Sequence, residues 1–340
     1  MFTCSIIVTK KKYDYIVDVI MPVYNQEEFV SQAIESVLMQ KTDFPVRLII
    51  GDDYSKDKTR EICQKYALNY PTRVKLILND RNIGLLENYK RIFNAAIAKY
   101  IAILEGDDYW IDEFKLRKQV NYFETHPAVG LVHTNCYDII WESGKIKNKY
   151  IHHINSNVKS GYIYEDLLNI NSIYALTAMF RKNLYDKYIQ IDDYIKNNFK
   201  TVDYGIWLDI ARHSEIHYIN DITANYRVHN MSISNSGNYE KNIEFLRTTY
   251  NIKIYSAQKY LDKKRIHEIE NGYIVNLITI NMSLRNHEKV SSLYNELQVY
   301  NYKSIVVKIL ASNKLCVNLY SYINNRRQQN LLNIKQRINQ

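Results

Sequence analysis

The sequence has little that would support a cysteine-bound metal or a secreted, disulfide-stapled fold. Its 340 residues include 4 cysteines, none of them arranged as Cys-x-x-Cys, which argues against both a zinc site and a disulfide framework. Long apolar runs are also missing, because no stretch approaches the roughly 20 residues of a membrane-spanning helix. The opening stretch MFTCSIIVTKKKYDY is too short in apolar residues, and wrongly flanked, for a signal peptide. We therefore expect reduced thiols and a cytoplasmic protein.

Glycine-rich phosphate loops are absent too. The chain has 9 glycines, but no Gly-x-Gly-x-x-Gly follows the first predicted strand, and no Gly-Lys-Ser/Thr loop occurs. This disfavours a dinucleotide-dependent dehydrogenase and a P-loop enzyme. A nucleotidyltransferase is disfavoured for a related reason, since no Gly-rich loop with a following Arg or Lys is found there, and it is kept as an alternative.

Acidic residues are missing from the end of the chain. Residues 1–239 carry 29 Lys+Arg and 29 Asp+Glu, whereas residues 240–340 carry 16 and 7, which accounts for the net charge of +9. No acidic residue follows Glu296. Such a segment suits an anionic surface, although a solvated basic helix face explains it equally well. Apolar residues beside lysines predict an amphipathic helix over about 303–323, either lying on a membrane or packed against the body of the protein.

What is present in the first part of the chain is an alternation of strand and helix patterns. Apolar, mostly β-branched runs predict strands at 15–23, 47–50, 74–78 and 99–104, with helical patterns between them. This order is typical of βαβ units. The sequence therefore predicts an α/β fold with a mainly parallel sheet flanked by helices.

From residue 112 the pattern changes to a helix, a hairpin, a strand at 174–182, and a helix from about Tyr204 followed by two short strands. After these, only helical patterns remain. We therefore expect two domains, an α/β domain over 15–235 and a helical, basic domain over 236–340.

Polar side chains gather in the turns that follow the predicted strands. Ligands of open α/β sheets bind outside the carboxyl ends of the strands, so a site is expected here. The residues concerned are Tyr24, Asn25 and Glu27 after the first strand, Asp52 and Asp53 after the second, and Glu105, Asp107 and Asp108 after the fourth. The last three carboxyl groups repel one another, and a buried cluster of this kind signals a cation between them. A solvated turn or a helix cap is the ordinary alternative.

Six segments, in this order, resemble family 2 of the glycosyltransferases, which are inverting nucleotide-sugar enzymes of the GT-A fold. They are VDVIMPVYNQEE, RLIIGDDYSKDKT, NIGLLEN, AILEGDDYW, VDYGIWLDIA and NYRVHNMSIS, and the resemblance spans roughly residues 15–232. AILEGDDYW is similar to the segment that holds the family's Asp-x-Asp motif, with Glu-Gly-Asp-Asp in place of the commoner Asp-Ser-Asp-Asp. The resemblance implies a Rossmann-like GT-A domain followed by an α-helical C-terminal region.

The resemblance also implies a metal site. Mg²⁺ or Mn²⁺ bridging the donor phosphates would be held by Asp107 and His229, and the imidazole nitrogen tilts the choice toward Mn²⁺. Glu105, one methylene longer than the usual aspartate, would bind ribose or a metal-bound water. A histidine satisfied near a strand end is the ordinary alternative for His229.

A nucleotide site follows from the same resemblance. Asp52 or Asp53 would accept the uracil imide N–H, Tyr24 would lie against base or ribose, and Pro22 would fix the turn. A helix cap for Asp53 and core packing for Tyr24 are the alternatives. The predicted set for the nucleotide is Pro22, Tyr24, Asn25, Glu27, Asp52, Asp53, Gly84, Asn88, Glu105, Gly106, Asp107 and Asp108.

An inverting transfer needs one base that takes the acceptor hydroxyl proton. Asp203 matches the family's base motif, although its context is Thr-Val-Asp-Tyr where many relatives have Glu-Asp or Gly-Asp. If Asp203 is a plain helix cap, then Asp192, Asp193 and Asp209 are the alternatives.

The sequence thus predicts an enzyme that transfers a sugar from a UDP-sugar to a glycan or lipid-linked glycan of a bacterial surface polymer. We expect it in the cytoplasm, with attachment to the inner face of the membrane through 297–340 as an option. An oligomer is open, and nucleic acid is disfavoured as a partner. The alternative outside enzymes is a non-catalytic, basic polyanion-binding protein.

Overall fold

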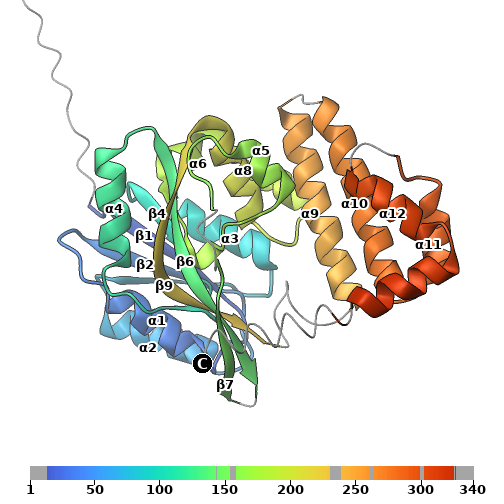
Figure 1. Ribbon diagram of the computed structural model, residues 1–340. Helices are drawn as coiled ribbons and strands as arrows, with labels where there is room; N and C mark the ends of the chain where they lie inside the picture. The colour runs from blue at the N-terminus through green and yellow to red at the C-terminus, as the bar shows by residue number, and fades with distance from the viewer. Residues whose placement is uncertain are drawn as a thin grey trace, which may run out of the picture.

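The fold is a twisted sheet covered by helices on both faces, with a bundle of further helices at one side (Figure 1). The computed structural model describes residues 14–142, 144–153, 158–229, 239–260, 263–298, 302–324 and 326. The strands are β1 (Val17–Val23), β2 (Val46–Asp52), β3 (Val74–Leu78), β4 (Tyr100–Ile103), β5 (Tyr109–Trp110), β6 (Val129–Glu142), β7 (Lys145–Ile151), β8 (Met179–Arg181) and β9 (Glu215–Val228).

The helices fall into two groups. Those of the α/β part are α1 (Val30–Leu38), α2 (Thr59–Asn69), α3 (Leu85–Asn94), α4 (Lys115–Thr125), α5 (Tyr164–Asn169), a 3₁₀ turn (Ala175–Thr177), α6 (Lys182–Tyr188), α7 (Ile191–Lys196) and α8 (Asp203–His213). Those of the bundle are α9 (Tyr239–Lys259), α10 (Lys263–Ser283), α11 (His287–Tyr294), α12 (Tyr302–Ala311) and a helical segment at 314–324.

The sheet order explains where a site can form. The strands run β3-β2-β1-β4-β8-β6-β9-β5, with β7 paired to β6. The first four are parallel, as the βαβ pattern predicted, while β8 is antiparallel to both β4 and β6. The carboxyl ends of β1, β2 and β4 therefore meet at one edge of the sheet.

Alternating side chains of the buried strands feed two cores. Val17, Val19 and Met21 of β1 pack with α1, α2 and α4 on one face, whereas Ile20 packs with α3 and α5–α8 on the other. All seven residues of β1 are buried. This two-sided burial is the reason for the nearly continuous apolar run in the sequence.

Three of our secondary-structure predictions were wrong in detail. The two short strands predicted after α8 form one strand, β9, because a break in the β6–β9 register lets it pass Asn220 and Asp221 without pairing. The strand predicted at 174–182 is a 3₁₀ turn followed by β8. The helix predicted over about 303–323 breaks near 312, where Asn313 accepts the backbone N–H of Cys316 (2.9 Å) and so starts a new helix.

The bundle joins the α/β part through its first helix. Ile252 and Ala257 of α9 belong to the same core as Ile20 and α8. Helices α10–α12 and the segment at 314–324 share a separate core that includes Ile278 and Val317. Among the helices that the structure describes, none is long and apolar enough to cross a bilayer.

Candidate active site

The loops after β1 and β2 are locked to each other. The backbone N–H of Asn25 donates to Oγ of Ser55 (3.0 Å), and Oδ1 of Asn25 accepts the N–H of Lys56 (2.8 Å). Asn25 and Tyr54 both have left-handed backbone, with φ of 51° and 66°. Residues other than glycine hold this conformation where surrounding contacts impose it, often at functional sites. The two loops therefore form a preorganised rim above the sheet.

Two predicted residues of the first loop have different surroundings. Oε2 of Glu27 accepts the N–H of Lys58 (2.8 Å), and the N–H of Glu27 donates to Asp57 (3.0 Å). Glu27 thus braces the second loop. Tyr24 is 45% exposed, so it is not a core residue, and its ring is available at the rim.

Gly106 sits where a side chain has no room. A Cβ at this position would lie 2.4 Å from Oε1 of Gln26 and 2.5 Å from Cγ1 of Val23. Its N–H donates to the carbonyl of Pro22 (3.3 Å), which is buried within β1. Pro22 and Gly106 therefore act through the backbone, by bringing the acidic loop against the first loop.

The paired aspartates at the end of β2 are both turned inward. Oδ2 of Asp52 forms an ion pair with Nε of Arg60 (2.6 Å), while Asp53 accepts the backbone N–H groups of Ile83 (2.8 Å) and Gly84 (2.9 Å). Asp52 is 0% exposed and Asp53 is 3% exposed. Asp53 therefore ties the β2 loop to the start of α3 and does not cap α2, while Arg60 neutralises the charge of Asp52.

Asn88 supports the rim from beneath. It is 1% exposed, its Nδ2 donates to the carbonyl of Gly51 (2.8 Å), and its Oδ1 accepts from Asn79 (3.2 Å). A Cβ on Gly51 would lie 2.7 Å from Oδ1 of Asn88. The side chain of Asn88 thus holds α3 against β2 and does not reach the surface.

The acidic residues after β4 converge as predicted. Glu105, Asp107 and Asp108 each offer a carboxylate oxygen within 4.8 Å of the others. Burial, and then the charges of Asp107 and Asp203, raise the pKa of Glu105 to about 8, although the hydroxyl of Tyr89 donates to it (2.9 Å). A divalent cation offsets such crowding of like charges, so the donor set fits a hard metal ion.

Two segments more than a hundred residues apart complete this edge. Nε2 of His229, just after β9, lies 3.2 Å from Oδ2 of Asp107. They are brought together because β5, directly after the acidic loop, pairs with β9. Asp108 reinforces the junction, since its Oδ1 accepts the N–H of Arg227 (2.7 Å). The structure therefore places these segments where one cation could contact both.

Asp203 opens α8 next to the acidic loop. It is half-buried, and its charge acts on both Glu105 and Tyr89. Burial raises the pKa of Asp203 above its usual value. A carboxylate with a raised pKa is a stronger base than an ordinary surface one.

The alternatives to Asp203 are engaged elsewhere. Asp209 is 1% exposed and accepts from Lys259 (2.8 Å) and Tyr260 (2.9 Å). Asp192 pairs with Lys90 on the surface (2.5 Å), and Asp193 accepts the hydroxyl of Tyr255. Among these acids, Asp203 is the one whose charge raises the pKa of Glu105.

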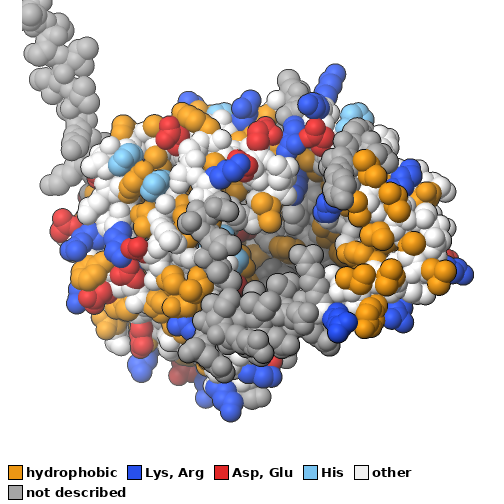
Figure 2. Space-filling model, in the orientation of Figure 1, with side chains coloured by type: hydrophobic (Ala, Val, Ile, Leu, Met, Phe, Trp, Pro, Cys, Tyr) orange, Lys and Arg blue, Asp and Glu red, His pale blue; other side chains and the backbone are white. Residues whose placement is uncertain are grey.

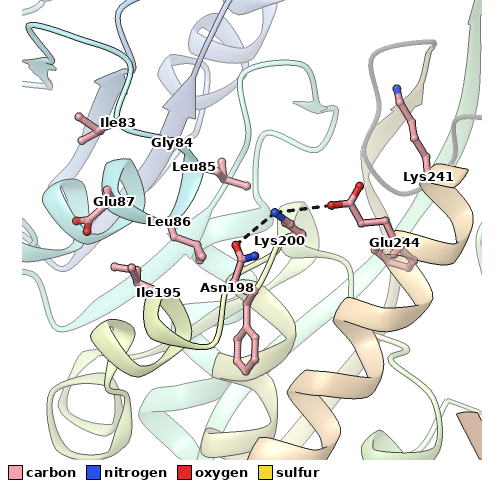
Figure 3. A pocket seen from close by; sticks show the side chains of 12 residues that line it. Ile83, Gly84, Leu85, Leu86, Glu87, Ile195, Asn198, Lys200, Lys241 and Glu244 are labelled. Atoms are coloured by element: carbon pink, nitrogen blue, oxygen red, sulfur yellow. Dashed lines mark hydrogen bonds and ion pairs between the residues drawn. The ribbon is translucent and has the colours of Figure 1, made fainter.

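A cavity of about 470 Å³ lies beside this edge, between the α/β part and the bundle (Figure 3). Its walls come from the start of α3, from the chain between α7 and α8, and from the first turns of α9. The lining residues are Ile83, Gly84, Leu85, Leu86, Glu87, Ile195, Asn198, Phe199, Lys200, Lys241, Glu244 and Phe245. Lys200 reaches Asn198 (3.3 Å) and Glu244 (3.7 Å), so an ion pair links the two parts across the cavity.

A protein-family model described as "Glycosyl transferase family 2" matches residues 18–189, which is half of the chain. The chain belongs to this family. The match covers β1 to α6 and therefore includes the rim and the acidic loop of this family 2 member.

Three relatives show how far the likeness extends. The protein Rv1520 of Mycobacterium tuberculosis is 44% identical over 124 residues, 36% of this chain and 35% of its own, so the match spans about a third of its length. The Escherichia coli UDP-Glc:alpha-D-GlcNAc-diphosphoundecaprenol beta-1,3-glucosyltransferase WfgD is 30% identical over 66% of this chain and 81% of its own. The putative teichuronic acid biosynthesis glycosyltransferase TuaG of Bacillus subtilis is 29% identical over 65% and 82%.

Solved structures share the fold. Staphylococcus aureus TarS 1–349, crystallised with UDP-GlcNAc, superposes with a TM-score of 0.58 at 16% identity, covering 93% of this chain and 92% of that one. The mannosyltransferase PcManGT of Pyrobaculum calidifontis, with GDP-Man and Mn²⁺, gives 0.52 at 14%, covering 93% and 90%. The fold of this family 2 member is therefore the GT-A fold with a helical C-terminal region.

Sequence reasoning missed several residues of this edge. Tyr89 contacts Glu105, and Arg60 neutralises Asp52. Arg227 stacks over Tyr109 (4.4 Å) and donates to the carbonyl of Asp107. Arg227 lies in NYRVHNMSIS, one of the six segments that carry the family resemblance. Its position two residues before His229 could therefore have indicated that it belongs to the site.

Proposed function

We propose that this protein is an inverting glycosyltransferase that transfers a sugar from a UDP-sugar to a hydroxyl of a surface-glycan acceptor. The observation that carries the proposal is the convergence of Asp107, His229 and Asp203 around the acidic loop. The names of WfgD and TuaG support a surface glycan as the product, and the UDP-GlcNAc bound to TarS supports a uridine nucleotide donor.

A metal ion fits the acidic edge. We propose that Asp107 and His229 hold Mn²⁺ or Mg²⁺, with Glu105 close enough to bind directly or through water. When bound, the ion would stabilise the negative charge of the leaving diphosphate. The Mn²⁺ in PcManGT supports this assignment. Arg227 supports Asp107 by holding its backbone carbonyl.

The nucleotide would lie along the rim. Tyr24 offers an exposed ring for the base or ribose. We assign the contact with the nucleotide base to Asp53 in preference to Asp52. The two oxygens of Asp53 accept from neutral backbone N–H groups, whereas Arg60 neutralises the charge of Asp52. Asn25, Glu27, Gly84, Asn88 and Gly106 would then act by shaping the rim.

The base would act from the opposite side of the donor sugar. Asp203, with its raised pKa, would take the proton of the acceptor hydroxyl while the hydroxyl oxygen attacks the anomeric carbon, and the bond between that carbon and the diphosphate oxygen breaks to release UDP. The walls of the cavity include Lys200, three residues before Asp203, and Glu87, two residues before Tyr89. We propose that the acceptor sugar binds there. Phe245, which is partly exposed, offers an apolar ring, and Asn198 offers hydrogen bonds.

The experiment is a thermal-shift screen of nucleoside diphosphates and nucleotide sugars, with and without Mn²⁺. A ligand that binds only the folded state raises its stability, so UDP with Mn²⁺ should raise the melting temperature most. Asp107→Ala should abolish the part of the shift that needs Mn²⁺, and Glu61→Ala, an exposed acid on α2, should not. If none of the nucleotides raises the melting temperature and the protein binds polyanions in a salt-sensitive way, the non-catalytic alternative is favoured instead.

The location and the domain division also remain proposals. We place the protein in the cytoplasm, where nucleotide sugars are available to it, and the boundary between its α/β and helical domains near residue 235.

A further inference from the structure

The last helical segment has apolar side chains on both of its faces. Val317 packs in the core of the bundle, and Ser321 on the same face donates to the carbonyl of Ser283 (2.9 Å); both are 1% exposed. Leu315, Leu319 and Ile323 lie on the opposite face and are 82%, 57% and 55% exposed. Their spacing of four residues places them in one row along the helix.

This row is part of a concentration of exposed apolar groups. Of the sixteen large hydrophobic residues exposed in the described part of the chain, six lie between 305 and 323. They are Ile305, Ile309, Leu315, Leu319, Tyr322 and Ile323. Figure 2 shows hydrophobic side chains gathered over the C-terminal helices, with Lys and Arg at their margin. Scattered exposed hydrophobics are normal, but a row on one helix marks an interaction surface.

Charge decides which partner this surface suits. Residues 297–340 contain seven Lys or Arg and no Asp or Glu. Lys314 and Arg326 flank the row and are exposed. An anionic lipid surface attracts such a segment and also receives its apolar side chains. A second copy of the chain, joined through the same face, would bring like charges together.

We propose that the face formed by Leu315, Leu319, Tyr322 and Ile323 docks on an anionic membrane surface. The helix lies in the headgroup region with its apolar row toward the acyl chains, and its basic residues meet the lipid phosphates. The docking needs neither donor nor acceptor, so it stands or falls independently of the proposed function.

The test is co-sedimentation of the full chain with vesicles. Vesicles of phosphatidylglycerol mixed with phosphatidylcholine should bind it, phosphatidylcholine alone should bind it weakly, and added salt should release it. Leu315→Ser with Leu319→Ser should weaken binding about tenfold or more, because each leucine loses a buried hydrocarbon chain. Both side chains are exposed, so the fold should survive, and an unchanged melting temperature checks this.

A matched control uses equally exposed apolar residues elsewhere. Leu68 on α2 is 80% exposed and Ile170 after α5 is 70% exposed, so Leu68→Ser with Ile170→Ser should leave vesicle binding unchanged. Equal loss in both double variants would overturn the proposal, as would no binding to phosphatidylglycerol. A dimer in solution that Leu315→Ser with Leu319→Ser dissociates would also overturn it, because the face would then belong to a second copy.

Discussion

At the scale of single residues, the carboxylates of the candidate site are of two kinds: some hold the fold together, and others are exposed to a ligand. Asp52, Asp108 and Asp209 are all buried and each accepts hydrogen bonds from the protein. Asp107 and Asp203 are only partly covered. Asp52, Asp108 and Asp209 therefore hold the fold through these bonds, whereas a partly covered carboxylate near other charges is accessible to a substrate.

The Asp203→Asn variant tests whether Asp203 acts as the general base or only supports the fold. We expect turnover to fall by about 10²–10⁴-fold, the usual contribution of a general base, while the affinity for UDP stays unchanged. Release of UDP in a coupled assay, with calorimetric titration of UDP, measures both. Asp192→Asn is the matched control, since this acid pairs with Lys90 on the surface. Full activity of Asp203→Asn would show that the base lies elsewhere.

At the scale of elements, hydrogen bonds between α8 and α9 fix the helix that begins with Asp203, the proposed base. Lys259 near the end of α9, together with Tyr260, bonds to Asp209 in the middle of α8. Tyr194 donates to the same carboxylate (2.8 Å). The first helix of the bundle thus fixes the helix that carries Asp203. This connection gives the helical region a direct influence on the site.

Helix α4 begins with a buried lysine. Lys115 is 0% exposed, its Nζ donates to Gln119 (2.8 Å), and it lies 4.5 Å from the Trp110 ring. Burial lowers the pKa of Lys115 to about 7. Because the unfolded chain keeps its proton up to a pKa near 10.5, this group makes the protein more stable as pH rises from about 7 to 10.5.

Lys115→Met removes that dependence. Below about pH 7 the variant should be more stable than the wild type. The difference between their free energies of unfolding should shrink as pH rises, by at most about 1.4 kcal/mol per pH unit. Urea unfolding of both proteins across this range measures it, and taking the difference cancels titrations that they share. Lys75→Met, at an exposed position on β3, should show no such trend. A difference that is constant with pH would mean that Lys115 stays charged in the fold.

At the scale of the whole molecule, the sequence predicted the arrangement of the site better than the contacts within it. The convergence of residues 24–27, 52–53 and 105–108 follows from the rule that parallel strands end at one edge. The inward turn of Asn88 was not predictable, because it depends on Gly51, which long-range packing brings near. The ion pair of Asp52 with Arg60 spans only eight residues, but Arg60 is also held by the carbonyl of Asn79 on the next loop. Similarly, β9 passes Asn220 and Asp221 because its neighbour β6 supplies a register break that the local sequence does not reveal.

The two cores predict that the molecule unfolds in two parts, and that the boundary between these parts is not the proposed domain boundary near 235. Ile252 of α9 is 1% exposed and packs in the core of the α/β part, whereas Val317 belongs to the separate core of the bundle. All 3 tryptophans, Trp110, Trp141 and Trp207, precede residue 235. Tryptophan fluorescence therefore reports the α/β part, while circular dichroism also reports the bundle.

Ile252→Ala should lower the unfolding midpoint seen by tryptophan fluorescence, at a cost of about 2–5 kcal/mol for the lost side chain and the cavity it leaves. Val317→Ala should destabilise the helical signal in circular dichroism and leave the fluorescence midpoint where it was. Each variant serves as the control for the other, since both remove buried β-branched side chains. Equal shifts of both signals in both variants would mean one cooperative unit, and α9 would then not be the place where the two cores divide.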